Sequence, residues 1–375
     1  GPVGLAAALL LTQAGRAPRL IEKRPDPSML SRALAVNPRT LDLLEPSGVT
    51  ARMLELGSPM RGVRMSRGGR TLAEITFEGI HPKYPFMLAL SQATTERLLT
   101  GALEAAGGRI ERPMHLTGCR ADAGMIEATI RDQRTSVTET SRHPWVLAAD
   151  GAHSTVRESM RIGFPGDAFA DDWHLADVPL RTDLEPDRGH VRFLDDGAFV
   201  FLIRVVDDQL HAPNGALLWR IISNRPDPVS RVTGIDPAGP PIWESRFRIA
   251  HRIATTLASG GVYLAGDAAH IHSPIGARGM NLGIEDAWVF TQLALRDRLA
   301  EYETLRRPID HSVVRRIEAF SKAVAAESGM LRFAREHLLP IALGIAPVRR
   351  RFMAMATGLD HPLPASLDPP RNHTL

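Results

Sequence analysis

The stretch that decides the fold reads Val262-Tyr263-Leu264-Ala265-Gly266-Asp267-Ala268-Ala269-His270, followed by Pro274-Ile275-Gly276-Ala277-Arg278-Gly279-Met280-Asn281. The apolar first part predicts a buried strand that ends at Gly266 and Asp267. A glycine-rich loop then leads into a predicted helix over residues 281–299. At the end of such a strand the Asp267 carboxylate can bind a ribityl hydroxyl. The helix N-terminus can stabilise negative charge on a flavin ring or a phosphate. The alternative is a glycine-rich loop that binds nothing.

The beginning of the sequence predicts part of a dinucleotide-binding turn. Gly1-Pro2-Val3-Gly4 opens a predicted helix. Gly1 would let the backbone approach a pyrophosphate, and Gly4 would let the helix pack closely on a sheet. The next predicted strand ends at Glu22, about twenty residues on, where an acid can accept hydrogen bonds from ribose hydroxyls. The first glycine of the complete fingerprint and the strand before it are missing, so an ordinary glycine turn before a helix is the alternative.

A third motif follows an apolar segment in the middle of the chain. It reads Asp150-Gly151-Ala152-His153-Ser154-Thr155-Val156-Arg157. A strand that ends in Asp-Gly at a cleft can direct a carboxylate at a ribose or a bound water. Asp-Gly is also a common tight turn. The full string Asp-Gly-x-x-Ser-x-Val-Arg favours the ligand-binding interpretation.

Composition excludes several classes of protein. With 375 residues, 44% hydrophobic and 23% charged, the chain is expected to form two globular domains, or one large domain with an insertion. The net charge is only +3, and no Lys/Arg block is interleaved with aromatic residues, so nucleic-acid binding is not predicted. No apolar run is long enough for stable membrane insertion. The single cysteine, Cys119, is expected to be structural and fits a reducing, cytoplasmic location.

Two further patterns could indicate a metal site or a catalytic nucleophile. His270 and His272 form a His-x-His pair, but no third or fourth ligand is evident in the sequence, so no metal site is predicted. Ser154 lacks the G-x-S-x-G context of a hydrolase nucleophile. No catalytic side chain is nominated.

The distribution of predicted strands and helices along the chain indicates an α/β fold with a β-rich insertion. Short strands separated by Asp, Pro and Gly clusters dominate from about residue 164 to 247, whereas helices and apolar strands alternate on either side. We expect a discontinuous Rossmann-type domain over residues 1–60, 89–164 and 250–310. The β-rich substrate domain would take residues 61–88 and 165–249, and a helical C-terminal segment and tail residues 311–375.

These three motifs, in this order, resemble the flavoprotein aromatic hydroxylases, the p-hydroxybenzoate hydroxylase-like FAD monooxygenases. The resemblance covers roughly residues 1–310 and includes shorter strings. These are Glu22-Lys23-Arg24, Ser31-Arg32-Ala33 with Asn37-Pro38-Arg39-Thr40-Leu41, Leu90-Ser91-Gln92 with Glu96, Trp243 with Ser245-Arg246-Phe247, and Tyr302-Glu303 with Arg306-Arg307-Pro308.

The resemblance implies a Rossmann-type FAD-binding domain and a role in cofactor binding for each matching position. The residues implied at the pyrophosphate, the adenosine and the phosphate–ribityl region are Gly1, Pro2, Val3, Gly4, Glu22, Lys23, Arg32, Gln92 and Leu116. Asp150 and Gly151 would serve both FAD and NAD(P)H. Those implied at the ribityl chain and the isoalloxazine are Gly266, Asp267, Pro274, Gly276, Gly279, Met280 and Asn281.

The implied reaction uses NAD(P)H to reduce FAD and O₂ to form a flavin C4a-hydroperoxide, which hydroxylates a small substrate of the aromatic class. A reductase or epoxidase of the same fold remains an alternative, whereas a halogenase is disfavoured because no Trp-x-Trp pair occurs. A plain NAD(P)-dependent dehydrogenase would leave two motifs unexplained. A non-catalytic flavin-binding protein is the reading that the incomplete first motif favours. Substrate identity, NADPH against NADH, and oligomeric state stay open.

One position departs from the family pattern. The loop reads Gly-Ala-Arg-Gly at 276–279, where many relatives have Gly-Gly-Gln-Gly. We hypothesise that Arg278 brings positive charge near the flavin or the substrate entrance; an outward-facing arginine is the alternative. Phe199, Phe201 and Trp219 are candidates for the substrate pocket, although alternation alone does not say which of them faces inward.

Overall fold

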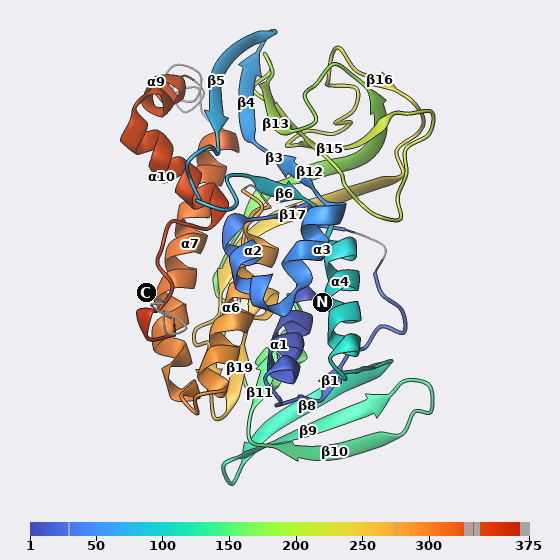
Figure 1. Ribbon diagram of the computed structural model, residues 1–375, viewed down its shortest axis with the longest axis vertical. Coiled ribbons are helices and arrows are strands. Elements are labelled where there is room, and N and C mark those ends of the chain that lie inside the picture. Colours follow the sequence, from blue (N-terminus) through green and yellow to red (C-terminus); the bar gives the residue numbers. More distant parts are fainter. Residues whose placement is uncertain (29–30, 275, 326–332, 334–337, 368–375) are drawn as a thin grey trace, which may run out of the picture.

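The computed structural model describes residues 1–28, 31–274, 276–325, 333 and 338–367 (Figure 1). The helices are α1 (Pro2–Gln13), α2 (Pro38–Leu44), α3 (Val49–Leu56), α4 (Gln92–Ala105), α5 (Thr155–Ser159), α6 (Gly279–Ala294), α7 (Tyr302–Ala325), α9 (Leu339–Gly344) and α10 (Ala346–Thr357), with 3₁₀ turns η1 (Glu45–Ser47), η2 (Gly266–Ala268), η3 (Leu299–Glu301) and η5 (Ala365–Leu367).

The strands are β1 (Leu20–Ile21), β2 (Ala35–Val36), β3 (Ser58–Met60), β4 (Gly62–Arg67), β5 (Arg70–Thr76), β6 (Met87–Ala89), β7 (Ile110–Glu111), β8 (Met114–Asp122), β9 (Met125–Asp132), β10 (Thr138–His143), β11 (Val146–Ala148), β12 (Gly166–Arg181), β13 (Arg188–Phe193), β14 (Phe199–Arg204), β15 (Leu217–Ser223), β16 (Asp236–Pro237), β17 (Trp243–Ile253), β18 (Ala258–Ser259), β19 (Val262–Leu264) and β20 (His270–Ile271). The predicted α/β fold with a β-rich part and a helical C-terminus is confirmed.

Helix α1 is covered by other helices. It packs against α4 and α6, and α6 in turn contacts α7 (Figure 1). Its sequence is rich in Ala and Leu because neighbours cover it on several sides, and the small side chains of Ala6, Ala7 and Ala8 let the helices approach closely. Helix α6 is buried along nearly its whole length.

Two pairs of parallel strands flank the beginning of α1. Strand β1 pairs with β7, and β11 pairs with β19, which also carries β18 on its other edge. A Cβ atom at Gly4 would lie 3.5 Å from the Cβ of Ala149 and 3.7 Å from Leu20 Cδ1. The start of α1 therefore lies against both pairs, at ordinary van der Waals distance, and the special packing role of Gly4 stays a prediction.

The β-rich part forms one large sheet in the order β20-β17-β12-β15-β14-β13-β4-β5, with β16 beside β12. The β4–β5 hairpin joins this sheet through parallel pairing of β4 with β13. Segments from two distant parts of the chain thus share one sheet, as the domain expectation supposed. The boundaries given above for the domains stay a prediction.

The two faces of the large sheet carry different aromatic residues. Phe199 packs edge-on against Trp173, with ring centroids 4.9 Å apart, and Phe201 lies against the same cluster. Trp219 belongs to the cluster on the opposite face, with Val200 and Leu202. Of the three candidates for the substrate pocket, Phe199 and Phe201 therefore share one face and Trp219 lies on the other, because successive residues of a strand point to opposite faces.

The C-terminal segment covers part of this sheet. Leu343 and Met353, from α9 and α10, join the cluster that contains Phe199. The predicted helical tail is confirmed where α7, α9 and α10 lie, whereas residues 326–332, 334–337 and 368–375 lie outside the described residues. Within the described part of the chain, no helix has the length and apolar character that crossing a membrane requires.

Candidate functional site

Two motifs from distant parts of the sequence meet at Val3. A Cβ atom at Gly283 of α6 would lie 2.6 Å from Val3 Cγ2 and 2.9 Å from the Cα of Gly266. A Cβ at Gly266 would itself lie 2.9 Å from Val3 Cγ2, and Gly266 adopts φ +58°. Only glycine permits this approach, because real Cβ atoms do not come so close to other heavy atoms. The N-termini of α1 and α6 are thereby brought to the same turn.

Buried polar side chains hold this junction together. Asp286 accepts a hydrogen bond from the backbone N–H of Gly266 at 2.9 Å. Arg157 donates to the carbonyl oxygens of Ala268 at 3.0 Å and Ala152 at 2.9 Å. The arginine of the Asp-Gly-x-x-Ser-x-Val-Arg string therefore ties its own loop to the turn at Asp267.

Gly1 and Glu22 lie next to each other, as a dinucleotide-binding turn requires. Glu22 Oε2 is 3.6 Å from the Gly1 nitrogen, and Glu22 Oε1 accepts from the N–H of Arg24 at 3.0 Å. Burial raises the pKa of the Glu22 carboxyl, but the hydrogen bond from the Arg24 N–H and nearby positive charges outweigh burial. The pKa is therefore lowered. Among the residues that the structure describes, no atom lies within 4 Å of a Cβ built at Gly1. Lys23 is exposed to solvent.

The predicted phosphate–ribityl residues also converge. Gln92 accepts from the N–H of Ala33 at 3.3 Å, which places it beside Arg32. Asp267 is exposed to solvent, yet protein surrounds its carboxyl closely enough that desolvation raises the pKa against the opposing charges of His270 and Arg32. A carboxylate that solvent still reaches, facing an exposed guanidinium, suits the binding of hydroxyl groups.

The Asp-Gly turn after β11 is open. Asp150 is exposed and accepts from the N–H of Val156 at 3.2 Å. Gly151 adopts φ +84°, and no atom lies within 4 Å of a Cβ built there. Leu116 of β8 is half-buried against the core cluster that contains Val156. Leu116 does not lie at the junction around Val3. It lies on β8, against the core cluster just named.

The loop before α6 has an unusual backbone. Gly276 has φ +88° and Ala277 φ +53°, a left-handed conformation that costs a residue with a Cβ about 1 kcal/mol or more. Asn281 holds this loop against the β2–α2 junction: its Oδ1 accepts from the N–H of Asn37 at 2.9 Å, and its Nδ2 donates to Ala35 and Ala277. Pro274 is exposed and Met280 buried; residue 275 lies outside the described residues.

His272 leaves a polar atom for a ligand beside this loop. Its Nε2 is shielded from solvent and has no hydrogen-bond partner in the part of the chain that the structure describes. Burial lowers the pKa of His272 to about 3, so the ring is neutral at ordinary pH. The ring lies near Gly279, since a Cβ there would be 3.8 Å from His272 Cε1. With the helix N-termini and the open glycines, this fits a large polar cofactor.

Arg278 corrects one expectation. Its side chain is 2% exposed and donates to Asp360 Oδ1 at 3.0 Å and to the carbonyl oxygen of Met355. The outward-facing alternative is therefore wrong. The charge is not free either, because a carboxylate from the C-terminal segment compensates it.

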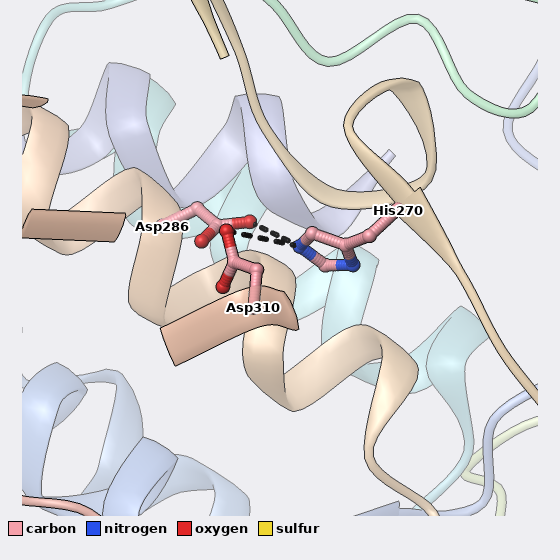
Figure 2. Close-up of side chains that lie close together, drawn as sticks. All are labelled: His270, Asp286 and Asp310. Atoms are coloured by element: carbon pink, nitrogen blue, oxygen red, sulfur yellow. Dashed lines mark hydrogen bonds and ion pairs between the residues drawn. The ribbon is translucent and has the colours of Figure 1, made fainter. Parts of the chain in front are cut away.

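His270 acquires neighbours that the sequence did not reveal. Figure 2 shows its Nε2 directed at two carboxylates, 2.7 Å from Asp286 Oδ2 and 3.9 Å from Asp310 Oδ2. By distance these three side chains could hold a metal ion. Arg306, however, already donates to both carboxylates at 2.8 Å. Despite desolvation, the two carboxylates raise the pKa of His270 to about 9, whereas burial raises the pKa of Asp310 to about 7.

Arg220 is a site residue that sequence reasoning missed. On β15 it forms two 2.7 Å hydrogen bonds with Asp177 and donates to the carbonyl oxygens of Ser31 and Arg32 at 2.6 Å. It thus anchors the segment that presents Arg32 to the large sheet. A charged residue inside the apolar run of residues 217–222 was the available signal, since arginine is almost never fully buried without a partner.

Comparison with known proteins settles the family. The FAD binding domain family matches residues 1–205 and 226–317. The chain belongs to this family. The chain is 32% identical to 6-methylpretetramide 4-monooxygenase of Streptomyces rimosus, over 96% of this chain and 68% of that protein. It is 29% identical to pentachlorophenol 4-monooxygenase of Sphingobium chlorophenolicum, over 86% of this chain and 63% of that protein. The chain thus spans about two thirds of the length of these relatives.

Solved structures agree. The anhydrotetracycline hydroxylase OxyS of Streptomyces rimosus superposes with a TM-score of 0.76 at 26% identity, covering 97% of this chain and 75% of that one. The p-nitrophenol 4-monooxygenase PnpA of Pseudomonas putida superposes with a TM-score of 0.80 at 21% identity over 96% of both chains, a likeness that concerns the fold alone. The resemblance to the flavoprotein aromatic hydroxylases is confirmed, and FAD is the cofactor of this family member.

Proposed function

We propose that this FAD-binding chain carries a monooxygenase that uses NAD(P)H and O₂ to hydroxylate a small aromatic substrate. The observation that carries the proposal is the junction of the N-terminal motif with the motif at Gly266 and Gly283, where these two glycines admit no side chain beside Val3, while Arg157 ties the Asp-Gly motif to Ala268. The relatives named above are monooxygenases of phenolic and polyketide compounds by their names. A cytoplasmic location belongs to the same proposal.

Each motif has a separate task in cofactor binding. The open turn at Gly1 and the N-terminus of α1 would hold the pyrophosphate, because unpaired N–H groups and the helix dipole favour anions there. Glu22 would bind the adenosine ribose. Asp267 would bind the ribityl chain, and the N-terminus of α6 would face the isoalloxazine. The bound flavin supplies the redox chemistry that activates O₂.

The protein's own contribution to substrate binding would come from the large sheet. Phe199 and Phe201 lie on the face that Leu343 and Met353 cover. An apolar face with aromatic rings binds a planar aromatic substrate by stacking and burial and excludes water from the reacting atoms. The substrate is therefore proposed to bind between this face and the loop before α6.

The first experiment tests cofactor binding and chemistry in one preparation. The FAD-loaded chain is reduced anaerobically with NADPH or NADH in the presence of a panel of phenols, and then mixed with ¹⁸O₂. We expect reduction to accelerate with one phenol and one ¹⁸O atom to appear in the product. Reduction without labelled product across the panel would favour the reductase alternative, and failure to bind FAD would reject the proposal.

A pair of variants tests the site itself. Glu22→Gln removes the charge proposed to bind ribose and is expected to weaken FAD binding about tenfold, the effect of one lost charge-assisted hydrogen bond. Glu55→Gln removes a solvent-exposed charge that pairs with Arg52 and is the matched control. Equal FAD affinity of the two variants would contradict the placement of the adenosine.

A further inference from the structure

The turn at residues 358–361, here called the C-terminal turn, lies on the helices that present the candidate FAD loop. Gly358 follows the last residue of α10 with φ +80°, and a Cβ there would lie 2.5 Å from Asn37 Nδ2. Asn37 caps α2 and is itself tied to Asn281 through its N–H. The chain can pass this close only because residue 358 is glycine.

Asp360 stands between two guanidinium groups within this turn. Its Oδ1 lies 3.0 Å from Arg278 Nη1, and its Oδ2 lies 3.1 Å from Arg316 Nη2 of α7. The side chains of Arg278 and Asp360 are 2% and 4% exposed, so solvent compensates neither charge. Burial opposes ionisation of the Asp360 carboxyl, but the hydrogen bond with His361 and the charges of Arg278 and Arg316 lower its pKa to about 2, so the carboxylate stays charged across the working pH range.

His361 fastens the same turn two helical turns further along α6. Its Nε2 lies 2.8 Å from Glu285 Oε1 and its Nδ1 3.1 Å from Asp360 Oδ1. Arg39 donates to the carbonyl oxygen of Gly358 at 3.2 Å. Both imidazole nitrogens face carboxylates, so the turn is attached to α6 at its first residues and at its middle.

We propose that Asp360 is a positioning residue for FAD: by pairing with Arg278, it fixes the turn at residues 276–279 in the conformation that receives the isoalloxazine. The inference rests on the proposed placement of FAD against residues 274–281. Arg278 immediately precedes α6 and follows Ala277, whose φ of +53° is unfavourable. Such a backbone persists only when its surroundings over-determine it. The buried pair between Arg278 and Asp360 supplies that constraint from outside the loop.

The proposal has a reciprocal consequence. If docking of the C-terminal turn favours the FAD-binding conformation, FAD must in turn favour docking of the C-terminal turn, because coupling free energies are symmetric. Residues 353–361 are not among the residues proposed to touch FAD. A change there on cofactor binding therefore reports the coupling rather than direct contact.

The first test uses hydrogen exchange on the whole wild-type chain, with and without FAD. We expect FAD to slow exchange at residues 276–281 and also at residues 353–361, whereas the β4–β5 hairpin serves as a reference. Protection at 276–281 with no change at 353–361 would overturn the inference while leaving the FAD site intact. FAD binding without protection at 276–281 would instead overturn the proposed placement of the cofactor.

The second test is a double-mutant cycle on FAD affinity. Asp360→Asn and Arg278→Gln should each weaken FAD binding at least tenfold, and the double variant should bind no more weakly than the weaker single variant. Asp297→Asn, which removes a surface partner of Arg16, is the control and should leave the affinity unchanged. Additive losses, or no loss in Asp360→Asn, would overturn the inference.

A spectroscopic readout separates positioning from general destabilisation. At saturating FAD, the visible circular dichroism of the bound flavin should change in Asp360→Asn and stay unchanged in Asp297→Asn. A wild-type spectrum in Asp360→Asn would mean that the flavin surroundings do not depend on this carboxylate, and the inference would fail. If Asp360→Asn does not fold, the exchange experiment on the wild-type chain decides alone.

Discussion

Replacing Gly283 with alanine tests directly the junction between the N-terminal motif and the motif around Gly266. The added methyl group would lie 2.6 Å from Val3 Cγ2 and 2.9 Å from the Cα of Gly266. Neither neighbour yields easily: Val3 is β-branched and sits on the packed helix α1, and Gly266 presents backbone. Helix α1 and the turn at Gly266 must therefore move apart.

The expected free energy has two parts. Forcing a methyl group into a packed junction costs about 1–3 kcal/mol. Alanine in place of glycine within a helix returns about 1 kcal/mol. The net loss in unfolding free energy of the apoprotein is thus about 0–2 kcal/mol. The loss in FAD binding is larger, because the shift separates the helix N-termini that are proposed to hold the two ends of one ligand, and we expect at least a tenfold weaker affinity.

Gly101→Ala provides the matched control. Gly101 lies inside α4, and a Cβ there meets no atom within 4 Å, so the same substitution should stabilise the chain by about 0.5–1 kcal/mol and leave FAD affinity unchanged. Urea unfolding of the apoproteins and FAD titration of each variant measure both quantities. Wild-type FAD affinity in Gly283→Ala would refute the reasoning that these motifs meet around the cofactor.

Three further predictions concern other buried groups. Arg220→Met leaves the Asp177 carboxylate buried without its partner and should lower the unfolding free energy by about 3–5 kcal/mol, whereas Arg181→Met at an exposed pair should change it by less than about 1 kcal/mol; urea unfolding compares them. The pKa of His270 is raised from 6.5 to about 9 by its carboxylate neighbours despite burial, so its stabilisation is complete below pH 6.5 and is lost as pH rises to 9. The unfolding free energy should fall by about 3 kcal/mol over that window, less so in His270→Asn. Burial raises the pKa of the Cys119 thiol to about 11, so alkylation of the native chain at pH 8 should be about a hundredfold slower than in urea; equal rates would contradict its burial.

Short motifs predicted the family and its cofactor, because a bound ligand imposes its requirements on short stretches of sequence. The glycines, Glu22 and Asp267 each follow a strand or open a helix, and that order survives in any fold that uses them. The helix expected over residues 281–299 ends instead at Ala294, since Asp297 adopts φ +54° and a 3₁₀ turn follows. Polarity alone does not reveal such a helix end.

Pairings between distant residues could not be predicted. The neighbours of His270 come from α6 and α7, and the partner of Arg278 comes from residue 360, so no local spacing links them. Strand β10 is mostly exposed and polar, and it exists only because β9 offers an edge. The face of Trp219 could not be predicted, because its strand is buried on both faces and shows no alternation of apolar and polar residues.

The contact of α1 with α6 has a consequence for synthesis of the protein. Val3 is translated well before its partners Gly266 and Gly283, which follow only after the β-rich part of the chain. Contacts of such separation form late, because the loop between them must close first. Ribosome-bound chains that end before α6 should therefore fail to take up FAD. Until α6 is made, the almost wholly apolar surface of α1 must be covered by α4 or by a chaperone.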